Sequence, residues 1–161
     1  MAVAPRGIWV IIASFFAAAA FVVAPLPSIF DWLRPDWLAL VLIYWCIALP
    51  HRVGIFSGFA LGLCMDVIRG GLLGQYAASY TVIAFISAKM YRRMRNFPVW
   101  QQAITVFIIL IIGQAVIYWI KGFIDEPVDF KYYWIPSIVG LIVWPLVYLF
   151  LRAIRRYFHV Q

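Results

Sequence analysis

Six apolar runs, separated by short segments that carry almost all of the charge, constrain the fold of this 161-residue chain most strongly. A helix that crosses a membrane needs about 20 predominantly apolar residues, and only the fifth and sixth runs reach that length cleanly. The shorter second, third and fourth runs are therefore expected to pack centrally, against protein. We predict an all-α membrane protein with a six-transmembrane-helix bundle, forming a single integral membrane domain over residues 1–161. The expected spans cover residues 8–24, 37–49, 54–68, 76–89, 100–120 and 133–151.

The composition excludes an ordinary soluble domain. Hydrophobic residues make up 66% of the chain and charged residues only 12%, whereas soluble domains are nearer half apolar and a quarter charged. The net charge of +7 does not indicate nucleic-acid binding, because the basic residues lie in short loops and beside apolar segments, without a stripe of interleaved aromatics. Orientation in the membrane and contact with anionic lipids explain the charge better.

The charges divide between the two sides of the predicted membrane. When the connecting segments are threaded through six spans, with the link at Pro50 as a tight turn, one side holds nine basic residues and no acid. The other side holds four basic and five acidic residues, and Asp66 lies just inside the membrane near it. Because lysine and arginine in short loops mark the cytoplasmic side, both termini are predicted to be cytoplasmic. The nine basic residues are Arg6, Arg52, Lys89, Arg92, Arg93, Arg95, Arg152, Arg155 and Arg156.

Glycines recur every four residues along the third run, at Gly54, Gly58 and Gly62. That spacing leaves one helix face with little more than backbone, which lets membrane helices approach closely. We expect packing within the bundle, with a homodimer as the alternative. Trp45 and Pro145 lie inside predicted spans, where the tryptophan suits packing or a partner and the proline should kink the sixth helix.

Asp66 continues the same four-residue series, and a carboxylate at that depth is costly unless it is paired, hydrogen-bonded or protonated. Arg69 is one turn away, and Arg34 lies in a loop on the same side. We therefore expect an ion pair that locks the outer mouth of the bundle. A proton relay is the alternative, but the other spans contain no chain of titratable groups that could continue it.

Basic residues and one histidine are expected at the cytoplasmic surface, where anionic lipid is the default ligand and a cytoplasmic protein is the alternative. No nucleophile paired with a base, no metal-ligand cluster and no phosphate-binding loop is recognisable, so we predict a protein that is not an enzyme and needs no cofactor. The residues assigned to this surface are His51, Arg52, Arg92, Arg93, Arg95, Arg152, Arg155 and Arg156.

Several short motifs together resemble the rod shape-determining MreD family. The resemblance spans nearly the whole chain and is most specific in the second and third runs. The motifs are Arg34-Pro-Asp-Trp, the run from Tyr44 to Arg52, the segment from Gly58 to Asp66 with the glycines from Gly70 to Gly74 after it, Trp100-Gln-Gln102, and Trp144-Pro145.

The resemblance implies a bacterial inner-membrane, multi-pass component of the peptidoglycan elongation machinery, which maintains rod cell shape. It implies binding to the bitopic protein MreC and, indirectly, to MreB filaments and a glycosyltransferase–transpeptidase pair. It also implies a bundle similar to the substrate-binding subunits of energy-coupling-factor transporters. The alternative function is a small-molecule (vitamin) binding subunit of such a transporter, although the helix interiors offer few polar groups to recognise a ligand.

Overall fold

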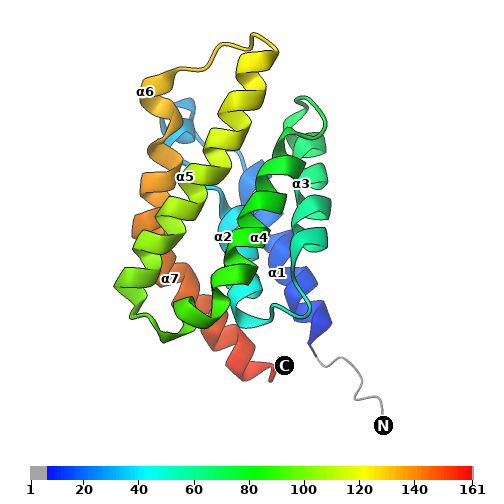
Figure 1. Ribbon diagram of the computed structural model, residues 1–161, viewed down its shortest axis with the longest axis vertical. Helices are drawn as coiled ribbons and strands as arrows, with labels where there is room; N and C mark the ends of the chain where they lie inside the picture. The colour runs from blue at the N-terminus through cyan, green and yellow to red at the C-terminus, as the bar shows by residue number, and fades with distance from the viewer. Residues whose placement is uncertain (1–6, 161) are drawn as a thin grey trace.

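The computed structural model describes residues 7–160, and within that range the chain is all-helical, without a strand. Each of the six apolar runs forms one long helix (Figure 1). Two short helices, η1 (Ser28–Leu33) and α6 (Phe130–Tyr133), lie in connecting segments. The long helices are α1 (Ile8–Val23), α2 (Trp37–Ala48), α3 (Ile55–Arg69), α4 (Gln75–Asn96), α5 (Val99–Phe123) and α7 (Ile135–Tyr157).

Two helical segments in the described chain are long and apolar enough to cross a membrane: Val99–Phe123, and Phe130–Tyr157, in which α6 runs into α7. The prediction that only the fifth and sixth runs have full spanning length is confirmed. Helix α1 is apolar but shorter. Pro145 lies within α7, and the kink expected there stays a prediction.

Two helices extend further than the apolar runs suggested. Helix α4 continues from the expected end at Lys89 to Asn96, and α7 continues beyond residue 151 to Tyr157. The added turns are rich in arginine, which is a good helix former, so loss of hydrophobicity does not end the helix. Pro98 ends α4, because the residue before a proline disfavours helical geometry.

Helix α2 lies at the centre of the bundle. Eleven of its twelve residues are buried, and it packs against α1, α4 and α7. Helix α4 is also central, since it contacts α2, α3 and α5. The expectation that the third run is central is wrong: α3 packs chiefly along α4, and its other face is open, with Phe56 91% exposed.

Charge is segregated along the bundle axis. Helix α1 begins and α7 ends at the lower end in Figure 1, which we call the basic end. Every acidic residue lies toward the opposite end, in the segments between α1 and α2, in the last turn of α3, or between α5 and α7. We call this the acidic end. Of the nine basic residues assigned to the cytoplasm, Arg6 lies outside the described residues, and the other eight are at the basic end.

Candidate functional site

Asp66 is held by backbone donors at the start of α4. Its Oδ2 accepts hydrogen bonds from the Gly74 N–H at 2.8 Å and the Ala77 N–H at 3.3 Å, and its Oδ1 accepts one from the Tyr76 N–H at 2.9 Å. The residue is 1% exposed. The first N–H groups of a helix have no partner within it, and the positive end of the helix dipole favours an anion there. Asp66 of α3 therefore caps α4.

The loop between α3 and α4 makes this cap possible. Gly70 and Gly74 have φ of +65° and +110°, which only glycine adopts readily. They turn the chain sharply enough for the start of α4 to return to the last turn of α3. In the sequence, these glycines could indicate a sharp turn after α3. They could not indicate that the Asp66 carboxylate would accept hydrogen bonds from the first N–H groups of α4.

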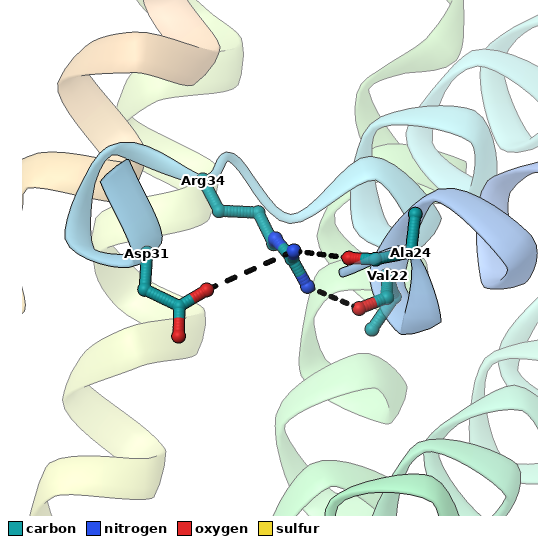
Figure 2. A network of polar contacts seen from close by, with 4 residues as sticks. All are labelled: Val22, Ala24, Asp31 and Arg34. Atoms are coloured by element: carbon teal, nitrogen blue, oxygen red, sulfur yellow. Dashed lines mark hydrogen bonds and ion pairs between the residues drawn. The ribbon is translucent and has the colours of Figure 1, made fainter. Parts of the chain in front are cut away.

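Arg34 fastens a different pair of elements at the acidic end, as Figure 2 shows. Its guanidinium donates to the carbonyl oxygens of Val22 and Ala24, at the end of α1, and pairs with Asp31 of η1 at 3.7 Å. The last carbonyls of a helix lack internal partners, so this arginine satisfies the end of α1 and ties it to the following segment.

The structure does not bring Asp66, Arg34 and Arg69 together in one ion pair. Among the described residues, Asp66 lies within 4 Å of no basic group, and the Arg69 guanidinium instead lies over the Tyr76 ring, 5.2 Å from its centroid. Asp66 and Arg69 both link α3 to α4, whereas Arg34 links the end of α1 to η1. The buried carboxylate is satisfied by hydrogen bonds from backbone amides, which stabilise its charge without a cation.

A cavity of about 620 Å³ opens at the acidic end between these contacts. Its wall carries charges of both signs, including Asp36, which accepts hydrogen bonds from the Tyr80 hydroxyl at 2.6 Å and from the Ala39 N–H at 3.3 Å. Sequence reasoning missed the bond between Asp36 and Tyr80, because these residues lie far apart in the chain. The charged lining residues are Asp31, Arg34, Asp36, Arg69 and Lys121, and the tyrosines are Tyr76, Tyr132 and Tyr133.

The titratable groups of the cavity wall are largely engaged in holding the fold. The chain between residues 7 and 160 contains no cluster of three or more His, Cys, Asp or Glu side chains that could hold a metal ion. The carboxylates of Asp36 and Asp66 are already engaged by helix N-termini.

The glycine face of α3 is occupied within the chain. A Cβ added to Gly58 would lie 2.7 Å from the Tyr80 carbonyl oxygen, and one added to Gly62 would lie 2.5 Å from the Tyr76 carbonyl oxygen. Both glycines thus permit backbone contact between α3 and α4. Gly54 is different, because a Cβ there would meet only the Pro50 carbonyl oxygen, at 3.9 Å.

The tryptophans inside the predicted spans are core residues. Trp45 and Trp144 are fully buried, and the Trp45 indole donates to the Ser14 hydroxyl of α1 at 2.8 Å. Trp45 is therefore not available to a partner on the surface. Pro145, the residue after Trp144, is partly buried.

Most basic residues at the basic end are exposed, and one of them also stabilises the fold. Arg95 donates from Nε to the Ile47 carbonyl at 3.0 Å and from Nη2 to the Ala48 carbonyl at 2.5 Å, and so caps α2. His51 and Arg52 are exposed in the turn between α2 and α3. The exposed arginines of the helical extensions are Arg92, Arg93, Arg95, Arg152 and Arg156, and Arg155 is partly buried.

Within the described part, the all-helical fold, the two helices of spanning length and the charge sorted to the two ends fit an integral membrane protein. The model of the rod shape-determining protein MreD family matches residues 5–154. The chain is also 36% identical over 153 residues to the rod shape-determining protein MreD of Haemophilus influenzae, covering 92% of each chain. The chain therefore belongs to the MreD family.

Membership identifies the protein as a membrane component of the machinery that determines rod shape. No solved structure matches the chain. These comparisons lend no support to the alternative of a vitamin-binding transporter subunit, since the family and the relative are both described as rod shape-determining proteins.

Proposed function

We propose that this protein is a non-enzymatic, multi-pass scaffold of the bacterial inner membrane that binds MreC and thereby links wall-synthesis enzymes to MreB filaments. The observation that carries the proposal is membership of the rod shape-determining family over nearly the whole chain. The proposed topology has six spans and the basic end in the cytoplasm, since basic residues in short loops stay on that side. The resulting bundle would resemble the substrate-binding subunits of energy-coupling-factor transporters.

We further propose that the outward face of α3 receives the membrane helix of MreC. Helix α3 is at the edge of the bundle, with its glycine face turned to α4. Its other face exposes two small residues four positions apart, Ala60 and Cys64, beside the aromatic rings of Phe56 and Phe59. Small residues at this spacing let a second helix approach closely in a membrane, and aromatic rings beside them add packing area.

Genetic complementation and co-purification of MreC test the scaffold function. A strain that lacks this protein should grow as rounded cells, and the intact chain should restore rods and co-purify with MreC from detergent-solubilised inner membranes. Normal rods in the depleted strain would contradict a role in cell shape. Restored rods without recovery of MreC would contradict the proposed partner, and recovery of a transporter module with a bound vitamin would favour the alternative function.

A further inference from the structure

A second cavity, of about 300 Å³, lies at the basic end, where α2, α4, α5 and α7 meet. This volume is at the lower end of the range of small-ligand sites. Its polar lining comes from all four helices. The polar residues of the wall are Tyr44, Arg95, Gln102, Tyr148, Arg152 and Arg155.

Among residues 7–160, no carboxylate pairs with the three arginines of this cavity. All six acidic residues lie toward the acidic end, and the ion pairs found among residues 7–160, those of Arg34 and Lys121, are there too. Three guanidinium groups around one cavity repel one another unless an anion lies between them. The guanidinium N–H groups match the geometry of carboxylate and phosphate oxygens, and phosphate is the group that every phospholipid headgroup carries.

Arg95 is already oriented. Two of its N–H groups are held by the carbonyls of Ile47 and Ala48, which leaves the others free, since a guanidinium has five. An arginine fixed in this way loses less side-chain entropy when it binds an anion. Tyr44 and Tyr148 also line the cavity, and their rings pack edge to face with centroids 5.8 Å apart.

Gln102 provides a second, independent indication of a ligand. It is 1% exposed, and its Nε2 donates to the Met94 carbonyl at 2.7 Å. Its Oε1 is buried and has no hydrogen-bond partner among the described residues. An unsatisfied buried oxygen is costly, and a hydroxyl group of a bound molecule would supply the missing donor.

We propose that this cavity binds the headgroup of an anionic glycerophospholipid that carries hydroxyl groups, with its phosphodiester on Arg95, Arg152 and Arg155 and a hydroxyl directed to Gln102. The position fits a lipid, because the cavity lies where α2 and α7 reach the basic end of a membrane bundle. The site is separate from the proposed MreC contact on α3.

Native mass spectrometry of the full chain in a neutral detergent tests the site, with phosphatidylglycerol, phosphatidylethanolamine and inorganic phosphate as probes. The chain should retain phosphatidylglycerol in preference to the other two. Replacing Arg152 and Arg155 together by alanine should weaken retention by at least about tenfold, the effect of losing about 1.4 kcal/mol of binding. The matched control, Arg93→Ala with Arg156→Ala, removes equal charge outside the cavity and should retain the lipid.

Equal weakening by both double variants would overturn the proposal, because the charge would then act as a diffuse surface. Equal retention of phosphatidylethanolamine would overturn the preference for an anion, and tight binding of inorganic phosphate without lipid would overturn the lipid assignment. If the alanine variant unfolds, Arg152→Lys with Arg155→Lys keeps the charge but loses the paired N–H geometry. That variant should bind phosphatidylglycerol more weakly than the parent, and unchanged binding would contradict the site.

Discussion

Helices α2 and α3 achieve their packing in opposite ways. Helix α2 is surrounded by protein and packs against its neighbours through large side chains, including the fully buried Trp45. Helix α3 packs through bare backbone at Gly58 and Gly62 on one side and exposes large apolar residues on the other. A short apolar helix can thus be either the core of a membrane bundle or its edge, and residue size on the contact face distinguishes the two.

The largest expected effect is loss of the α2 core through Trp45→Ala. Removing a buried tryptophan leaves a cavity, and it also leaves the Ser14 hydroxyl without its indole donor. We expect a loss of about 4 kcal/mol in the free energy of unfolding, measured by denaturant titration in mixed micelles. Trp119→Ala is the control, because Trp119 is 73% exposed. A similar loss in both variants would contradict the assignment of α2 as the core.

The contact between α3 and α4 should be sensitive to a single methyl group. Gly62→Ala would place Cβ against the backbone of α4, and such overpacking costs about 3 kcal/mol. Gly122→Ala in α5 meets no atom within 4 Å and should stabilise the helix by about 1 kcal/mol. The same unfolding titration checks both. An unchanged stability in Gly62→Ala would show that α3 is not in close contact with α4.

Asp66→Asn tests the cap that joins these two helices. The amide replaces one acceptor oxygen with a donor, although both carboxylate oxygens receive N–H groups from α4. We expect a loss of about 2 kcal/mol, together with faster hydrogen exchange at residues 74–77. Asp125→Asn, in an exposed loop, is the control. If Asp66→Asn kept normal stability and assembly but abolished rod shape, a chemical role for Asp66 would replace the structural one.

The smallest effect on stability is expected on the outward face of α3. Phe56 is 91% exposed, so Phe56→Ala should change the free energy of unfolding by less than about 0.5 kcal/mol. The same substitution should reduce co-purification of MreC, since it removes packing area from the proposed contact. A variant that is both stable and fully able to recover MreC would exclude Phe56 from that contact.

The helices were predictable from the sequence because each apolar run is bounded by prolines, glycines or charges. The close approach through Gly58 and Gly62 was predictable from their spacing, although the spacing could not show that the partner is α4. The partners of Asp66 and Arg34 could not be predicted. Both side chains bind backbone groups of other elements, and a backbone N–H or carbonyl has no signature in the sequence.

The basic cavity was beyond sequence analysis for a related reason. Arg95, Gln102 and Arg152 belong to three different helices, and only the packing of those helices brings them together. In the sequence, the arginines read as parts of exposed clusters. The helical extensions of α4 and α7 past their apolar runs are what bring Arg95 and Arg152 to one cavity.

Photocross-linking offers the most direct test of the central claim that α3 is the edge helix that receives MreC. Cys64 is exposed on the outward face of α3. In membranes, a photoreactive p-benzoylphenylalanine in place of Cys64 should form a cross-link with co-expressed MreC on irradiation, because this reaction needs contact between the groups but no water. The same photoreactive residue in place of Leu146, at an exposed position of α7, should form no cross-link with MreC. A cross-link from position 146 and none from position 64 would contradict the account.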